Sequence, residues 1–136
     1  MPTQIYLNLP VKDLDRSVGF FRQLGYSFDP KFTDDNATCM IVGENIFVML
    51  LVEKFFQTFT SKAIADASRT TEAIVCLSAD SRVAVDLLAD KALAAGGTPS
   101  GELQDHGWMY GRSFQDLDGH LWEVVHMDLT AEGAPQ

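Results

Sequence analysis

The chain has 136 residues and a formal net charge of −9 at pH 7, from 10 Lys and Arg against 19 Asp and Glu. This length suits one ordinary domain, and a content of 46% hydrophobic and 21% charged residues excludes a disordered chain. The excess of acidic residues argues against nucleic-acid binding, because a nucleic-acid binder needs a basic surface. No apolar run approaches the roughly 20 residues that span a bilayer, and no secretion signal precedes the first strand. We therefore expect a cytoplasmic protein that contacts neither nucleic acid nor membrane.

The first half of the chain predicts a strand, a helix and three further strands. Residues 5–11 alternate like a strand, although Pro10 weakens its end. Asp13 is a suitable helix cap, and Leu14, Val18 and Phe21 lie on one helical face that ends before Gly25. Short strands are predicted to follow over residues 26–29, 37–42 and 45–52.

The second half repeats this order. Residues 72–78 predict a strand, and Asp80 or Ser81 caps a helix that runs to Ala95 with Leu87 among its inward residues. A weak strand near 101–104 precedes strands over 108–114 and 121–127, which are joined by a turn at 116–119.

The chain therefore predicts an α+β fold built from two β-α-β-β-β modules. Module 1 covers about 1–52, module 2 covers about 72–128, and residues 129–136 form a tail. The connecting segment 53–71 contains Phe55, Phe56 and Phe59, which is too apolar for a free linker, so we expect a short helix or lid whose rings pack in the core. Cys39 and Cys76 lie in apolar strands and are predicted to be buried, reduced thiols.

Four stretches in this order resemble the vicinal-oxygen-chelate superfamily, the group of glyoxalase I, bleomycin-resistance proteins and extradiol dioxygenases. They are residues 9–25, with Leu-Pro-Val-Lys-Asp-Leu-Asp-Arg-Ser at their start; residues 47–51; Leu77-Ser78; and the F-x-D-x-D-G-x-x-x-E pattern from Phe114 to Glu123. The resemblance implies that each module curls its sheet into a half-open cup, that the modules form a curved mixed-sheet cleft for a small molecule, and that two chains pair as a homodimer.

The resemblance also implies where a metal would bind. The positions that carry the family's ligands correspond to Tyr6, Met49, Ile74 and Glu123. A thioether and an alkyl group do not bind a hard divalent cation, and Tyr6 would have to ionise. A shift of two residues along the strands would bring in Asn8 and Glu72, which still make a weak set. We therefore expect no complete metal site, with Glu123 the only matching ligand, and no cofactor.

Other candidate ligand-binding residues lie in module 2. His106 precedes a strand in a loop that would border the cleft, whereas His126 has the opposite parity to Glu123 and is expected to face the helix. Trp108, Tyr110 and Arg112 alternate along one strand face. They would form either an aromatic wall with a carboxylate-binding arginine or ordinary sheet packing.

Three functions follow from this combination. The first is a glyoxalase-like protein with a small-molecule cleft and no complete metal site, in which Glu123 is the candidate catalytic residue if it is an enzyme. The second is a metal-dependent lyase, isomerase or dioxygenase of the glyoxalase type, and the third is a bleomycin-resistance-like protein that binds and sequesters its ligand. The sequence favours the first and leaves open whether the chain is catalytic.

Overall fold

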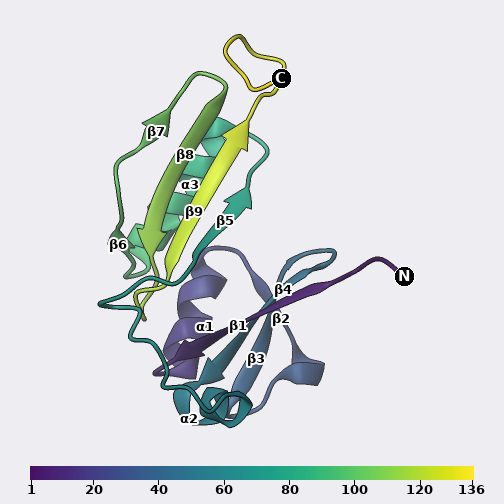
Figure 1. The fold of residues 1–136 in the computed structure, drawn as a ribbon, viewed down its shortest axis with the longest axis vertical. Coiled ribbons are helices and arrows are strands. Elements are labelled where there is room, and N and C mark those ends of the chain that lie inside the picture. The colour runs from purple at the N-terminus through teal and green to yellow at the C-terminus, as the bar shows by residue number, and fades with distance from the viewer. The chain divides into compact units, whose positions relative to one another are not determined.

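A computed structural model describes all residues from Met1 to Gln136. The chain divides into two compact units, unit 1 from Met1 to Asp66 and unit 2 from Ala67 to Gln136, and the division falls inside the predicted connecting segment. Each unit has its own open sheet with a helix on one face (Figure 1). No helix in the chain is long and apolar enough to cross a membrane.

Unit 1 has a four-stranded mixed sheet in the order β1-β4-β3-β2, in which β1 and β4 are parallel and the other pairs are antiparallel. The main-chain N–H of Arg16 donates to the Asp13 carboxylate at 3.1 Å, which confirms Asp13 as the helix cap. In chain order the elements are β1 (Ile5–Val11), α1 (Leu14–Gln23), β2 (Ser27–Asp29), η1 (Pro30–Phe32), β3 (Ala37–Gly43), β4 (Ile46–Val52), α2 (Glu53–Phe56) and η2 (Gln57–Phe59).

Unit 2 repeats this topology with the order β5-β9-β8-β6, and a short additional strand, β7, pairs with β8. Of the two predicted helix caps, Ser81 is the one used, since its hydroxyl accepts the N–H of Ala84 at 3.0 Å. The elements are β5 (Ile74–Ser78), α3 (Arg82–Ala94), β6 (Thr98–Pro99), β7 (Gln104–Asp105), β8 (Met109–Gln115) and β9 (Leu121–Met127). The predicted α+β fold with a repeated β-α-β-β-β order is confirmed.

Three local predictions were wrong. The weak strand near 101–104 is replaced by β6 and β7, because only the residues on either side of Gly101 pair with β8. Leu87 is 55% exposed, since α3 turns Val85, Ala89 and Ala92 toward the sheet instead. Phe59 is 68% exposed rather than part of the core, although its ring contacts that of Phe55 in an edge-to-face pair with centroids 5.1 Å apart.

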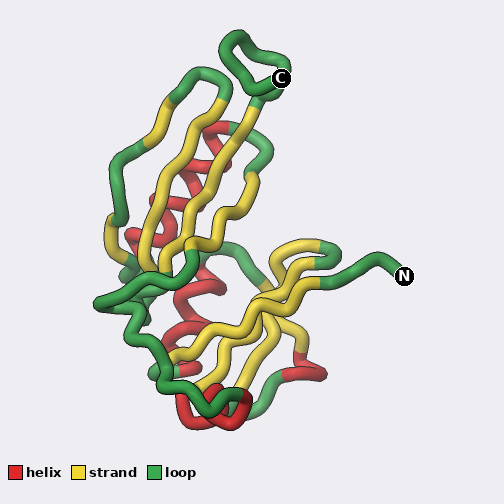
Figure 2. The backbone as a smooth tube through the Cα atoms, in the orientation of Figure 1, coloured by secondary structure: helices red, strands yellow, loops and turns green.

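The core of each unit lies between its helix and its sheet. In unit 1, Phe20 and Phe21 of α1 are buried, as are Met40, Val48 and Leu50 of the sheet. In unit 2, Val85 and Ala89 of α3 pack against Tyr110 and Val124. Because alternate strand residues point to opposite faces, these contacts define a helix-covered face and an open face for each sheet (Figure 2).

Candidate functional site in unit 2

Glu123 lies in the middle of the open face of unit 2. It is on the central strand β9, where it pairs with Cys76 of β5 on one side and Ser113 of β8 on the other. Register partners on neighbouring strands share a face, so these three side chains form a row across the sheet. Val124, the next residue, packs on α3, which places Glu123 on the face that the helix leaves open.

A hollow of about 410 Å³ is lined by Glu123 and Ser113 of this row. Its only charged lining side chains are two carboxylates, Glu102 and Glu123. The remaining lining residues are apolar, hydroxyl-bearing, amide-bearing or glycine: Ile74, Ser100, Gly101, Gln104, Met109, Ser113, Leu121 and Trp122. The volume falls within the roughly 300–1,000 Å³ of small-molecule sites, so the hollow suits a compact organic ligand.

A buried carboxylate fixes the strand that carries Glu123. The Asp116 carboxylate accepts the main-chain N–H of Asp118 at 2.9 Å, the main-chain N–H of His120 at 3.0 Å and the indole N–H of Trp122 at 3.0 Å. Burial raises the pKa of Asp116, partly offset by the charge of His120 and by these hydrogen bonds. The motif that was predicted to form a turn therefore also anchors the start of β9, directly before Glu123.

Cys76 differs from its prediction. Its side chain is exposed, whereas Cys39 in unit 1 is buried as expected. The reason is that α3 covers the face of Val75 and Leu77, so that Cys76 lies on the open face beside Glu123. Partial desolvation, together with the charge of Glu123, raises the pKa of the Cys76 thiol.

The open face of unit 1 brings together its predicted ligand-binding residues. Asn8 and Met49 are register partners, and Tyr6 lies on the same face two residues before Asn8. The Tyr6 ring stacks on Phe47 with centroids 5.0 Å apart, and its hydroxyl donates to Gln4 at 2.9 Å. This face is uncharged on three of its four strands, because β1, β3 and β4 contain no Asp, Glu, Lys or Arg.

Tyr110 and Arg112 lie on the helix-covered face of unit 2 and not beside Glu123. The Tyr110 hydroxyl donates to Asp86 at 2.7 Å, and Arg112 donates to Asp86 at 3.2 Å and to Asp90 at 2.7 Å. These bonds join β8 to α3. The sequence left open whether these residues form a ligand-binding wall or ordinary sheet packing. Tyr110 and Arg112 belong to ordinary sheet packing, because the Arg112 guanidinium already binds two carboxylates of α3.

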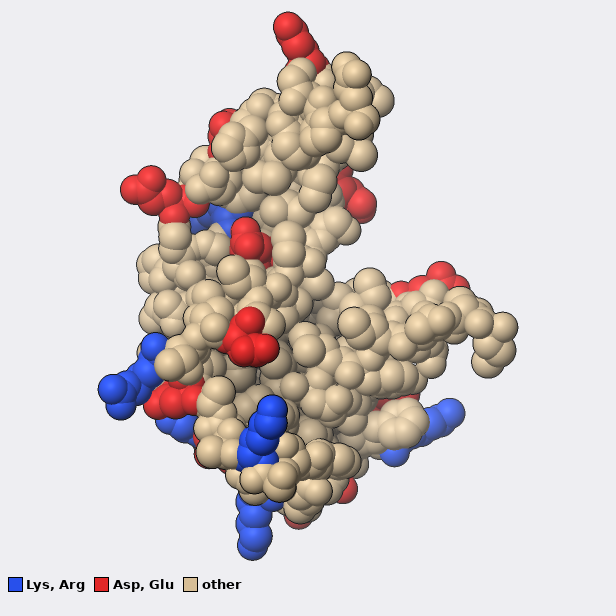
Figure 3. All heavy atoms as spheres, viewed as in Figure 1, with Lys and Arg blue, Asp and Glu red and all other residues tan.

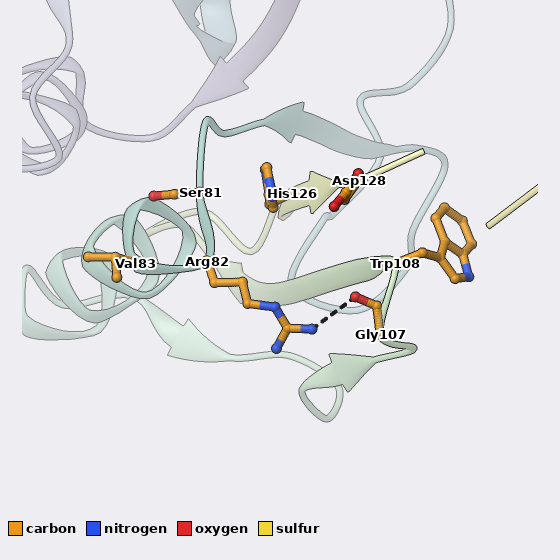
Figure 4. Close-up of a pocket in the computed structure, with 7 residues that line it drawn as sticks. All are labelled: Ser81, Arg82, Val83, Gly107, Trp108, His126 and Asp128. Carbon is orange, nitrogen blue, oxygen red and sulfur yellow. Dashed lines mark hydrogen bonds between the residues drawn. The ribbon is translucent and has the colours of Figure 1, made fainter. Parts of the chain in front are cut away.

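Trp108 and His106 lie at the end of unit 2 where β7 turns into β8. Trp108 lines a second hollow, of about 360 Å³, together with Arg82, His126, Asp128 and others (Figure 4). His106 is exposed, and its Nε2 lies 3.2 Å from the Gln104 side-chain oxygen. His126 contacts the Ala79 carbonyl through Nδ1 at 3.0 Å, which confirms that it faces away from Glu123.

The residues at the predicted metal positions do not fit a divalent cation. The strand partners of Glu123 are Cys76 and Ser113, which offer a thiol and a hydroxyl. Ile74 pairs with Leu121, and Met49 pairs with Asn8. No group of three or more His, Cys, Asp or Glu side chains is arranged to hold a metal ion. A hard cation requires several oxygen or imidazole ligands, which this donor set lacks.

Sequence reasoning missed several residues of the hollow over Glu123. Ser113 could have been found from the strand pairing had the register of β8 on β9 been known. Glu102 and Gln104 come from a segment with no periodic pattern, and only the folded chain brings them near β9. In the view of Figure 3 the visible face of unit 2 is mostly uncharged, with a few separate acidic side chains.

Comparison with known proteins agrees with this fold. Residues 3–43 match the family model described as bleomycin resistance protein-like N-terminal. A search of curated proteins found no match. Among solved structures, a hypothetical protein, SA1046, from S. aureus has 28% identity and a TM-score of 0.78, covering 93% of this chain and 95% of that one.

Two further structures show the same fold at low identity. A glyoxalase/bleomycin resistance protein/dioxygenase family enzyme from Burkholderia phytofirmans has 15% identity and a TM-score of 0.77, covering 93% of this chain and 99% of that one. The fosfomycin resistance protein FosX from Listeria monocytogenes has 15% identity and a TM-score of 0.66, covering 96% and 97%. The sequence match over residues 3–43 is to a bleomycin-resistance-like model, and the fold over nearly the whole chain is that of glyoxalase, bleomycin-resistance and dioxygenase proteins, in agreement with the resemblance to the vicinal-oxygen-chelate superfamily.

Proposed function

We propose that the chain binds a small organic cation in the hollow over Glu123, without a resident metal. The observation that carries the proposal is the charge of the lining: two carboxylates, Glu102 and Glu123, and no Lys or Arg. An ammonium group close to these carboxylates would gain charge-assisted hydrogen bonds. The net charge of −9 adds a long-range attraction for cations.

The rest of the lining specifies the body of the ligand. Ile74, Met109 and Leu121 offer apolar surface, while Ser100, Ser113 and Gln104 offer hydroxyl and amide groups. A ligand with one positive end and an apolar body would place each part against a matching surface. We therefore name the ligand class as primary amines with an aromatic or aliphatic body.

Binding and sequestering, as in the bleomycin-resistance-like alternative, accords with this site. The family model at the N-terminus is described by bleomycin resistance, and one structural neighbour by fosfomycin resistance. The metal-dependent lyase or dioxygenase alternative is not favoured, since three of the four matched positions carry Tyr, Met and Ile. The homodimer expected from the resemblance remains part of the proposal, and sedimentation at micromolar concentration tests it separately from the site.

The experiment is an NMR titration with benzylamine, which is a cation at pH 7. The matched probes are benzyl alcohol, which is neutral, and benzoate, which is an anion of similar shape. We expect benzylamine to bind more tightly than either probe and to shift the amide signals of β8 and β9. Replacing Glu123 by Gln removes one charge-assisted hydrogen bond, so the affinity for benzylamine should fall about tenfold.

The control variant is Glu44→Gln, which removes the same charge from an exposed turn in unit 1. It should leave the benzylamine affinity within about twofold of the wild type, because Glu44 does not line the hollow and the charge of an exposed side chain is screened by salt. Equal affinity for benzylamine and benzoate, or equal losses in Glu123→Gln and Glu44→Gln, would refute the proposed site.

A further inference from the structure

The hollow over Glu123 is called the cation pocket below. One of its rims is formed by residues 100–107, the strap, which links β6 to β8. Four strap residues line the pocket: Ser100, Gly101, Glu102 and Gln104. The strap therefore supplies one of the two carboxylates. Its residues from Gly101 to Gly107 are all exposed, and only the two residues of β7 pair with β8. Figures 1 and 2 show this segment running along the outer side of β8.

Glycines stand at both ends of the strap's exposed part. Gly101 has a φ of +66° and Gly107 a φ of +82°, in the left-handed region where glycine is preferred. At Gly101 the strap also passes close to the pocket floor, since a Cβ there would lie 3.4 Å from the Ser113 hydroxyl. A segment with few ladder bonds and a glycine at each end opens at lower cost than the strands it covers.

A single side chain of α3 holds the far end of the strap. The Arg82 guanidinium donates to both carboxylate oxygens of Asp105, at 2.8 and 2.9 Å, and to the carbonyl of Gly107 at 3.1 Å. Figure 4 shows the last of these bonds, with Arg82 reaching from the helix to the strap. The guanidinium carbon also lies 4.8 Å from the centre of the Tyr110 ring.

The ion pair between Arg82 and Asp105 has good hydrogen-bond geometry but is exposed to solvent. The Arg82 and Asp105 side chains are 45% and 43% exposed. Exposed ion pairs are weak, so a two-pronged pair of this kind is able to break and re-form. Arg82 lines the second hollow and not the cation pocket, so it would affect a bound cation only through the strap.

We propose that Arg82 is a positioning residue for the cation pocket. Its hydrogen bonds to Asp105 and Gly107, here called the clasp, hold the strap against α3 and keep Glu102 at the rim. Ligand enters and leaves when the clasp opens. The inference rests on the proposed function. It predicts two linked consequences of weakening the clasp, namely a more mobile strap without ligand and a faster release of a bound amine.

Amide hydrogen exchange on the ligand-free protein tests the first consequence. Arg82→Lys keeps the charge and loses the two-pronged contact, and Asp105→Asn removes the charge from the other side. Both should accelerate exchange by about threefold to tenfold at His106, whose N–H donates to the Met109 carbonyl, and at Gln104, the next hydrogen-bonded position of β7, and leave β9 unchanged. Arg69→Lys, an exposed substitution of the same type in unit 2, is the control and should change neither.

Benzylamine binding tests the second consequence by a double-mutant cycle. Arg82→Lys should weaken binding about threefold, mainly through faster release measured from NMR line shapes. In a Glu102→Gln background the same substitution should weaken binding by less, because Arg82 acts by placing Glu102. A general structural role for Arg82 would give the same loss in both backgrounds.

The outcomes separate this inference from the proposed function. If the wild type does not bind benzylamine, the proposed function fails and the positioning role fails with it. If the wild type binds and Glu123→Gln weakens binding, but Arg82→Lys and Asp105→Asn change neither strap exchange nor release, the positioning role alone is overturned. Faster strap exchange with an unchanged release rate would overturn it as well.

Discussion

The two units share one topology but attach their helices to their sheets by different means. In unit 1, α1 buries Phe20 and Phe21, which contact each other edge to face with ring centroids 4.9 Å apart. In unit 2, α3 buries only Val85, Ala89 and Ala92. Large aromatic side chains therefore hold one helix, while the other buries only small side chains.

Polar contacts supplement the small apolar contact of α3. Asp86 and Asp90, one turn apart on the helix, accept hydrogen bonds from Tyr110 and Arg112 of β8. Arg82, one turn earlier, reaches the strap. The same difference extends to the open faces, since the central strands of unit 1 carry no charge and β9 of unit 2 carries Glu123. The inner strands of the two repeats thus differ in charge: β8 and β9 of unit 2 carry Arg112 and Glu123, whereas β3 and β4 of unit 1 carry no charged side chain.

The largest expected effect comes from removing an aromatic side chain of α1. Phe21→Ala should lower the free energy of unfolding of unit 1 by about 3–5 kcal/mol, because it leaves a large cavity at a residue that is 1% exposed. Val85→Ala in α3 removes less volume and should cost unit 2 about 1–3 kcal/mol. Urea titration followed by far-UV circular dichroism measures both.

Tryptophan fluorescence sharpens this comparison, since both tryptophans, Trp108 and Trp122, belong to unit 2. If the units unfold separately, Phe21→Ala should shift the circular dichroism transition and leave the fluorescence transition in place. An equal shift of both signals would show that the units unfold cooperatively. A larger cost for Val85→Ala than for Phe21→Ala would contradict the contrast drawn between the two helices.

A smaller effect is expected at the polar anchor of β9. Asp116→Ala would leave three N–H donors without their carboxylate, including the indole of the buried Trp122. The free energy of unfolding should fall by about 2–4 kcal/mol, since buried unpaired donors are costly. Urea titration measures the loss, and the exposed Asp35→Ala in unit 1 should change stability by less than about 0.5 kcal/mol. Equal effects of the two variants would show that Asp116 anchors nothing.

The smallest effect concerns the acid sensitivity of the clasp. Hydrogen bonds from Arg82, and then from the Gly107 N–H, lower the pKa of Asp105 from 3.8 to about 2. A lowered pKa means that this contact stabilises the native state above about pH 4 and loses its contribution as the pH falls toward 2. Carbon-13 NMR of the Asp105 carboxyl should titrate near 2 in the wild type. In Arg82→Lys it should move toward 3.8, and an unchanged titration would contradict the clasp geometry.

The amino-acid pattern alone was enough to predict the order of the helices and strands and which strand residues share a face. Asp13 and Ser81 cap helices because their side chains accept main-chain N–H groups, and the caps are readable wherever an apolar helical face follows. Strand alternation was enough to predict that Glu123 and His126 point to opposite faces of β9, which their contacts confirm. The family resemblance followed from the same ordered pattern of strands, turns and helices.

Which face of the second sheet is open, and which residues border it, depends on contacts between segments that are far apart in the chain. The alternation of side chains along β8 predicts that Tyr110 and Arg112 share a face. The packing of α3 covers this face and leaves Cys76 exposed on the other. Glu102 has no periodic signal, because its position depends on the strap pairing with β8 and on the Arg82 contact. Local patterns fix how side chains alternate along a strand, whereas contacts between distant segments fix which of the two faces a ligand can reach.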